Sequence, residues 1–371
     1  MKQEDVDYMR LALQEANKGR GRTSPNPCVG AIIVRDNVIV GKGHHRKAGT
    51  PHAEVNAIED AGSNTVGATI YVTLEPCNHT GRTPPCTKAI IDAGLSRVVV
   101  GMTDPNPSVI GGGCAYLLSQ GLIVESGVLD DECRAINRPF IKHSTTGLPW
   151  VVMKAGMSLD GKISYVPGKG GRITGDKSKH VTHELRNSLD ALLVGVDTAI
   201  IDDPSLTTRL PGTKDKRDPV RVILDTHLRL SPDARVLRQQ SDAQTWIYCG
   251  SEVNSDLKDL LVEAGALVFP VNVSSEGRLD MRTVFSHLGA NGITSVLVEG
   301  GASIHGSMFA NDLVDEVYLF TAPVFIGDKG IPLLSGYSLS SDNCPRIETI
   351  DCRMLGDDIL LHGYVNHCES Q

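Results

Sequence analysis

The pattern of hydrophobic and polar positions divides the chain into alternating helical and strand-like segments. Val6, Met9 and Leu13 recur at the spacing of one helical face, which predicts a helix over 4–19. The same reading predicts a hairpin over 28–43 that turns at Asp36-Asn37, helices over 51–62 and 84–94, strands over 68–76 and 97–104, and a helix followed by a strand over 115–128. This alternation predicts a three-layer α/β domain.

Polar and turn-forming residues cluster between Ser144 and Pro149, and a new strand pattern begins directly after them. We therefore expect two domains, 1–147 and 148–371, each with its own core. The second part predicts strands over 149–164, 191–196, 220–226, 245–250 and 294–301, helices over 177–189 and 303–316, and antiparallel strands over 316–325 and 358–365. This is a second α/β pattern.

Composition narrows the class of protein. The 371 residues are 40% hydrophobic and 22% charged, as in soluble globular proteins with substantial cores. A formal net charge of -8 gives no general attraction for nucleic acid or for an anionic membrane. The charged start predicts no signal peptide, and nine cysteines, an odd number, favour a reducing compartment. We therefore expect a cytoplasmic protein with no nucleic-acid or membrane partner.

Two short motifs carry the side chains needed to hold zinc: HAE at 52–54 and TLEPCNHTGRTPPC at 73–86. A catalytic zinc site usually takes three protein ligands and leaves the fourth position to water, which suits His52, Cys77 and Cys86. Glu54 is not needed as a ligand and is expected to move a proton from the water to a leaving amine. Both predicted ligand segments open helices, whose N-termini favour a thiolate at Cys86.

Other interpretations of these residues stay open at this point. His79 could complete a structural site with four protein ligands, and Cys77 and Cys86 could form a disulfide. In addition, the usual zinc-deaminase signature has two residues between its cysteines, whereas the segment NHTGRTPP separates them here.

These motifs, with PNPCVGAIIV before them and DPNP after them, closely resemble the deaminase half of the bifunctional deaminase/reductases of riboflavin biosynthesis, in which the longer loop is normal. The resemblance implies a cytidine-deaminase-like three-layer α/β/α fold, one zinc ion per chain, and a small-molecule substrate, a diaminopyrimidinone that carries a ribosylamino 5-phosphate. It places substrate contacts at Asn26, His79, Arg82, Asp104 and Asn106. Asn and Asp suit ring amines and carbonyls, and an arginine suits the phosphate. A simple turn is the alternative for each PNP.

The second domain offers weaker signals of its own. It contains no GxGxxG fingerprint, and a near-match to a P-loop fails because Ile163 stands where Ser or Thr must bind magnesium. Glu299-Gly300-Gly301 ends an apolar strand and opens a helix, a turn at which backbone N–H groups can approach an anion. The two glycines also suit a tight turn that packs helix on sheet.

Four motifs, MKAGMSLDGKI, ALLVGVDTAIIDDPSLTTR, VILDT and LVEGGASIHGS, look like the reductase half of the same family. This resemblance implies a dihydrofolate-reductase-like α/β fold that uses NADPH. It places the cofactor against Gly156, Met157, Arg172, Thr198, Asp202, Thr226, Gly301, Ala302, Ser303, Ile304, His305, Gly306 and Ser307. It places substrate contacts at Lys154, Gly170, Arg186, Leu206, Arg209 and Glu299. A core position for Met157 and a solvated helix face for Arg186 are the alternatives.

Together the motifs predict a deamination followed by an NADPH-dependent reduction of the ribosyl group to a ribityl chain. Glu299, Lys154 or a water is the expected proton donor of the reduction. An enzyme of this class is expected to form a homo-oligomer, either a dimer or a tetramer. The rival functions are a deaminase of free nucleotides or tRNA, and a non-enzymatic zinc module fused to a nucleotide-binding domain.

Overall fold

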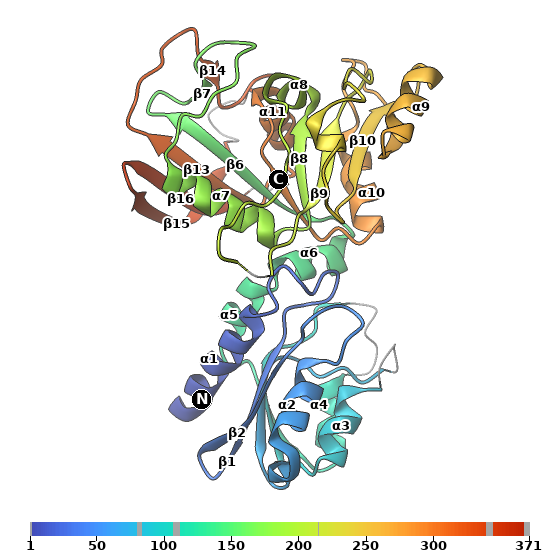
Figure 1. Ribbon diagram of the computed structural model, residues 1–371. Coiled ribbons are helices and arrows are strands. Elements are labelled where there is room, and N and C mark those ends of the chain that lie inside the picture. The colour runs from blue at the N-terminus through green and yellow to red at the C-terminus, as the bar shows by residue number, and fades with distance from the viewer. Residues whose placement is uncertain (1, 80–83, 107–111, 214, 339–343, 367–371) are drawn as a thin grey trace. The chain divides into compact units, whose positions relative to one another are not determined.

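The computed structural model describes residues 2–79, 84–106, 112–213, 215–338 and 344–366. The chain divides into two compact units, Met1–Gly147 and Leu148–Gln371 (Figure 1). Among the described residues, no helix is both long enough and apolar enough to cross a membrane.

A five-stranded sheet forms the centre of the first unit, with helices on both faces (Figure 1). The strand order is β2-β1-β3-β4-β5, with β1 antiparallel to β2 and β3, and with β3, β4 and β5 parallel. The elements are α1 (Gln3–Asn17), β1 (Gly30–Arg35), β2 (Val38–His44), α2 (Ala53–Ala61), the 3₁₀ turn η1 (Gly62–Thr65), β3 (Thr69–Leu74), α3 (Cys86–Asp92), β4 (Arg97–Met102), α4 (Gly113–Ser119), β5 (Ile123–Ser126), α5 (Asp130–Ile136) and α6 (Arg138–Thr146). This confirms the predicted three-layer arrangement.

Glycines let the helices of the first unit approach the sheet closely. A Cβ on Gly30 would lie 2.1 Å from the carbonyl oxygen of Ala12 in α1, and one on Gly43 would lie 2.3 Å from that of Ala53 in α2. Gly43 pairs with Ala31, the neighbour of Gly30, and adjacent strand residues face opposite sides. The two helices therefore cover opposite faces, and the contact at Ala53 fixes the beginning of α2.

The second unit contains a nine-stranded sheet of order β11-β10-β9-β8-β12-β6-β13-β16-β15 and a separate pair, β14-β7. Strands β6 and β8 to β13 run parallel, and the hairpin β15-β16 adds antiparallel strands at one edge. The elements are β6 (Trp150–Ser158), β7 (Lys162–Ser164), α7 (Asp176–Ser188), β8 (Ala191–Gly195), α8 (Val196–Asp202), β9 (Val220–Leu224), η2 (Arg235–Leu237), β10 (Thr245–Gly250), α9 (Ser255–Glu263), β11 (Ala266–Val271), α10 (Met281–Ala290), β12 (Ser295–Val298), α11 (Ala302–Ala310), β13 (Glu316–Ala322), β14 (Ile331–Pro332), β15 (Arg346–Leu355) and β16 (Asp358–Asn366).

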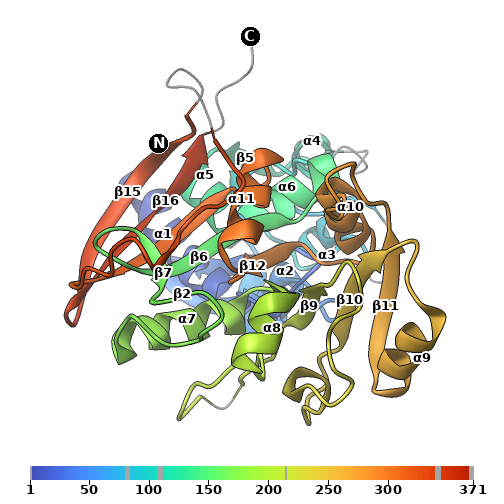
Figure 2. The ribbon, with the colours of Figure 1, turned by 90° about the horizontal axis from the view of Figure 1, so that it is seen from above.

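Helices cover both faces of this second sheet, as the view in Figure 2 shows. Phe285 of α10 and Met308 of α11 are buried in one core, and Leu185 of α7 and Leu261 of α9 are buried in the core on the other face. Because all central strands run parallel, their carboxyl ends meet at one edge of the sheet. Ligands of open parallel sheets bind at such an edge.

Several predicted elements differ from the structure. The helix predicted over 303–316 ends at Ala310, where Asn311 caps it and Asp312 has a φ of 52°. The helices α5, α6, α8, α9 and α10 and the strands β11 and β15 were not predicted. Strand β15 is exposed along almost its whole length, so it shows no alternation of apolar and polar residues to detect.

Candidate active sites

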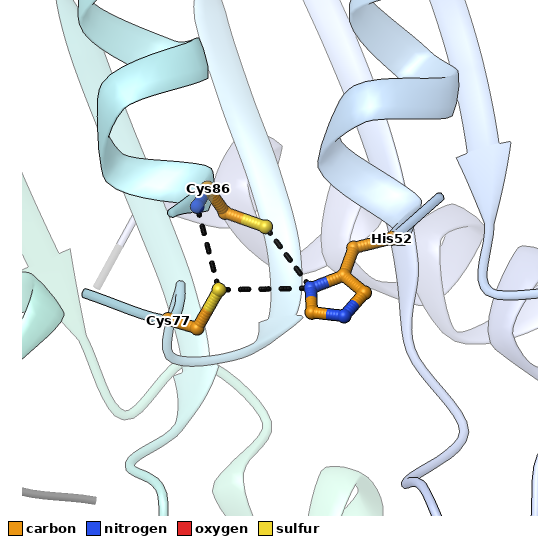
Figure 3. A group of neighbouring side chains, drawn as sticks. All are labelled: His52, Cys77 and Cys86. Carbon is orange, nitrogen blue, oxygen red and sulfur yellow. Dashed lines mark hydrogen bonds between the residues drawn. The ribbon is translucent and has the colours of Figure 1, made fainter. Parts of the chain in front are cut away.

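Three elements of the first unit bring His52, Cys77 and Cys86 together, as Figure 3 shows. His52 is the N-cap of α2, Cys86 is the first residue of α3, and Cys77 follows the carboxyl end of β3. Nδ1 of His52 lies 3.2 Å from Sγ of Cys86 and 3.6 Å from Sγ of Cys77. The three ligand atoms all lie within 4.8 Å of one another.

This geometry fits a tetrahedral zinc ion. Zinc bonds of about 2.3 Å to sulfur and about 2.0 Å to nitrogen, at tetrahedral angles, separate a nitrogen and a sulfur ligand by about 3.5 Å. Hydrogen bonds from the Cys86 thiol and from His52 lower the pKa of Cys77 to about 4, and the backbone N–H of Cys86 donates to the same sulfur at 3.3 Å. The site therefore already favours a thiolate ligand.

Glu54 lies in the first turn of α2 and is only 3% exposed. Burial raises the pKa of its carboxyl, and the negative charge of Cys77 raises it further. A carboxyl group with a raised pKa in a dry site can both accept and donate a proton near neutral pH. Its position two residues after His52 places it on the helix turn that carries a predicted ligand.

The structure supports neither of the alternatives for these metal ligands. Among the described residues, His79 is not part of the ligand group, and its side chain is exposed. Cys77 and Cys86 both carry free thiols. The arrangement therefore matches three protein ligands and an open fourth position rather than a closed structural site.

The predicted substrate contacts of the first unit are only partly described. Nδ2 of Asn26 lies 3.1 Å from Nε2 of His45. Oδ1 of Asp104 accepts a bond of 2.9 Å from the backbone N–H of Asn106. Burial raises the pKa of Asp104, with contributions from Glu75 and Cys77 and an opposing one from His79, so Asp104 lies within electrostatic reach of the ligand group. Arg82 lies outside the described residues.

Sequence reasoning missed two side chains that support these contacts. His45 is 2% exposed, and its Nδ1 lies 3.2 Å from the carbonyl oxygen of Pro51. The carboxylate of Glu75 accepts backbone N–H bonds from Asp104 and Cys114. The position of Glu75, two residues before Cys77, could have drawn attention to its carboxylate. Its hydrogen-bond partners could not be predicted, because they are distant in sequence.

The second unit has a cavity of about 1000 Å³ at the carboxyl edge of its parallel strands. Most of the residues predicted to contact the cofactor or the substrate of the reduction line this cavity. They are Lys154, Gly156, Gly170, Arg172, Arg186, Thr198, Asp202, Leu206, Arg209, Thr226, Glu299, Gly301, Ala302, Ser303, Ile304 and His305. Met157, Gly306 and Ser307 are not among the described residues that line the cavity. A Cβ on Gly306 would lie 2.0 Å from the carbonyl oxygen of Ser335, so close packing already accounts for this glycine.

A buried ion pair lines this cavity. Arg186 donates from Nε to Oε1 of Glu299 at 2.6 Å and from its terminal nitrogen to Oε2 at 2.8 Å, and the two side chains are 11% and 10% exposed. Burial opposes ionisation of Glu299, but Arg186 and Lys154 outweigh it and hold its pKa at about 2. Burial lowers the pKa of Lys154, whose Nζ lies 3.9 Å from Glu299. The solvated-face interpretation of Arg186 is therefore wrong.

Two buried histidines line the cavity, and Nδ1 of His305 donates to the carbonyl oxygen of Leu333 at 3.2 Å. His183 lies three residues before Arg186 on α7, and its Nδ1 accepts the backbone N–H of Arg209 at 3.1 Å. Burial lowers the pKa of His183 to about 4, with the Arg186 and Arg209 charges acting in the same direction. This histidine, which sequence reasoning missed, therefore fixes the backbone of Arg209. Burial likewise lowers the pKa of His305 to about 4.

Comparison with known proteins assigns both units. Residues 2–102 match the cytidine and deoxycytidylate deaminase zinc-binding region, and residues 149–361 match the RibD C-terminal domain. The riboflavin biosynthesis protein RibD of Bacillus amyloliquefaciens is 41% identical over 356 residues, covering 95% of this chain and 94% of that protein. RibD of Escherichia coli K12 is 37% identical, covering 97% and 99%.

Two solved structures resemble the whole chain. Acinetobacter baumannii RibD aligns with a TM-score of 0.88 at 34% identity, covering 98% of this chain and 99% of that one. A diaminohydroxyphosphoribosylaminopyrimidine deaminase/5-amino-6-(5-phosphoribosylamino)uracil reductase of Thermotoga maritima aligns with a TM-score of 0.86 at 35% identity, with the same coverage. Neither rival function is favoured by these matches. This chain belongs to the RibD family, the bifunctional enzymes of riboflavin biosynthesis that join a zinc-binding deaminase domain to a reductase domain.

Proposed function

We propose that the first unit hydrolyses the ring amine of 2,5-diamino-6-ribosylamino-4(3H)-pyrimidinone 5′-phosphate, and that the second reduces the ribosyl group of the resulting aminouracil. The observation that carries the first assignment is the convergence of His52, Cys77 and Cys86 beside the buried carboxyl of Glu54. The substrate names follow from the Thermotoga maritima relative.

In the deamination, His52, Cys77 and Cys86 would hold one zinc ion. A bound zinc supplies a Lewis acid that makes water a nucleophile near neutral pH. Glu54 takes the proton that the water loses as its oxygen bonds to the ring carbon, and passes that proton to the amine, which leaves as ammonia. Asn26, His79, Arg82, Asp104 and Asn106 are proposed to bind the ring and the phosphate.

In the reduction, a bound NADPH would supply the hydride. The chain's own residues would hold the ribosyl group so that its C1 receives the hydride as the carbon–oxygen bond of the sugar ring opens. Lys154 is proposed to give the ring oxygen its proton, because burial lowers the pKa of its ammonium and so makes it a better acid. Glu299 orients Arg186 through both carboxylate oxygens, and its Oε2 lies 3.9 Å from Nζ of Lys154. The remaining lining positions predicted above are proposed to hold the cofactor and the phosphate.

The same proposal covers the substrate class, the oligomeric state, the cellular compartment and the zinc content. The substrate is a small phosphorylated pyrimidine rather than a nucleic acid, the chain forms a dimer or a tetramer, and it acts in the cytoplasm with one zinc per chain. Light scattering after gel filtration measures the oligomeric state, and metal analysis of the purified protein measures the zinc content.

The order of the two steps provides the test of this function. Adding the diaminopyrimidinone ribosyl phosphate and NADPH to the enzyme should release ammonia first and oxidise NADPH only afterwards. Release of ammonia without NADPH oxidation would refute the proposal for the second unit and leave that for the first unit intact.

A further inference from the structure

We infer that Glu75 is a positioning residue for the deamination, because its carboxylate fixes the backbone at both Asp104 and Cys114 against the turn that carries Cys77. This inference rests on the proposed function, in which Asp104 and Asn106 contact the substrate. Glu75 itself has no proposed contact with substrate or metal.

The two oxygens of Glu75 bond two backbone groups that are ten positions apart. Oε2 accepts the N–H of Asp104 at 3.2 Å, and Oε1 accepts the N–H of Cys114 at 3.0 Å. The backbone of Glu75 is held in turn, because its own N–H donates to the carbonyl oxygen of Met102 at 2.9 Å. Glu75 therefore joins the end of β3 to the end of β4 and to the beginning of α4.

Close packing shows that this attachment is tight. A Cβ on Gly113 would lie 1.9 Å from the carbonyl oxygen of Pro76, so the backbone before Cys114 abuts the residue between Glu75 and Cys77. The 75–77 turn thus carries a metal ligand at one end and holds the start of α4 at the other. Movement of the Asp104 backbone relative to Cys77 requires at least one of the two carboxylate bonds to break.

The attachment extends from Asp104 into the proposed substrate site. Oδ1 of Asp104 accepts the N–H of Asn106 at 2.9 Å, which fixes Asn106 relative to Asp104. Glu75 therefore sets the positions of two proposed substrate contacts through one backbone bond. Displacing groups that bind the substrate equally in the ground state and the transition state raises KM and leaves kcat unchanged.

The chemistry of the side chain explains why a glutamate is required here. Two N–H donors need two acceptors, and glutamine offers one acceptor and an NH₂ group that faces the second donor. We therefore expect Glu75→Gln to lose one of the two bonds and to raise the KM for deamination about tenfold, the effect of one hydrogen bond to a charged group. The kcat should stay within about threefold, because Glu54 and the ligand group are unchanged.

The experiment compares Glu75→Gln with a matched control in the same unit. Asp60→Asn removes a carboxylate that also accepts a backbone N–H, from Lys42 at 2.9 Å, but that bond lies outside the proposed site. The control should keep the wild-type KM. Zinc content and reduction of the deaminated substrate should remain at wild-type levels in both variants, and a purely structural role for Glu75 would instead lower the zinc content and kcat together.

A double-mutant cycle tests whether Glu75 acts through Asp104. Asp104→Ala alone should raise KM, and adding Glu75→Gln should have little further effect, since coupled residues are not additive. Additive effects, or a KM unchanged by Glu75→Gln while Asp104→Ala raises it, would overturn the inference and leave the proposed function standing. If Asp104→Ala and Asn106→Ala both keep the wild-type KM, the proposed substrate site is wrong and the inference fails with it.

A shorter carboxylate keeps the test informative if the glutamine variant does not fold. Glu75→Asp retains two acceptors but cannot reach both donors at once. Its KM should therefore lie above that of wild type. Where Glu75→Gln can also be measured, the KM of Glu75→Asp should lie below that of Glu75→Gln. A wild-type KM in folded Glu75→Asp and a loss of zinc in that variant would each contradict the inference.

Discussion

Replacing Glu299 by glutamine should destabilise the second unit by about 3 kcal/mol at pH 7. Glu299 makes two short bonds to Arg186 in a nearly dry environment. Its pKa of about 2 in the folded protein, against an ordinary value of 4.5, corresponds to roughly 3 kcal/mol of stability at neutral pH. Breaking a buried pair costs about 3–5 kcal/mol because it leaves an uncompensated charge, here on Arg186.

The effect has a defined dependence on pH. The pKa of Glu299 is lower in the folded than in the unfolded chain, so its contribution is complete above 4.5 and declines as the pH falls toward about 2. Glutamine does not titrate. The difference in unfolding free energy between wild type and Glu299→Gln should therefore narrow as the pH falls from about 5 toward about 2.

Fluorescence isolates the second unit in this assay. Both tryptophans of the chain, Trp150 and Trp246, lie in that unit, so urea unfolding followed by tryptophan emission reports on it alone. Asp176→Asn is the control, because the pair of Asp176 with Arg172 is exposed and should leave stability unchanged. Equal stability of wild type and Glu299→Gln at pH 7, or a difference that does not change with pH, would refute this reasoning.

Three further predictions concern the other features of the protein. Removing the metal with a chelator should abolish ammonia release and leave NADPH-dependent reduction of the deaminated substrate intact, which separate assays of the two steps will check. Gly30→Ala should destabilise the first unit by about 2 kcal/mol in calorimetric unfolding, because its Cβ would lie 2.1 Å from the carbonyl oxygen of Ala12, and a wild-type transition would contradict the packing. His183→Ala should raise the KM of the reduction about fivefold through the lost bond to Arg209, whereas His183→Asn, which keeps an acceptor, should restore much of it.

The sequence contained enough local information to predict the candidate metal site. His52 and Cys86 each begin a helix that a short apolar pattern and a closing glycine already indicated, and Cys77 follows an apolar strand. Local spacing therefore carried most of this prediction. The long segment between Cys77 and Cys86 departs from the usual zinc-deaminase signature. Only the resemblance to the family, and not geometry, accounted for the length of this segment.

Other parts of the protein depend on contacts that no local pattern records. The carboxylate of Glu75 bonds residues 29 and 39 positions away, and Arg186 and Glu299 are separated by 113 positions. Helix α6 has nine residues and none of them is fully buried, so it offers only a short apolar segment to detect. Such elements are defined by tertiary packing, and the sequence alone gave no basis for predicting them.

The most direct test of the account is the Glu54→Gln variant, measured for zinc content and for ammonia release in the same preparation. The account predicts that zinc stays at the wild-type level, that ammonia release from the diaminopyrimidinone substrate is lost, and that the deaminated substrate is still reduced. Ammonia release at the wild-type rate with zinc in place would contradict the proton-transfer role of Glu54, which is the central claim.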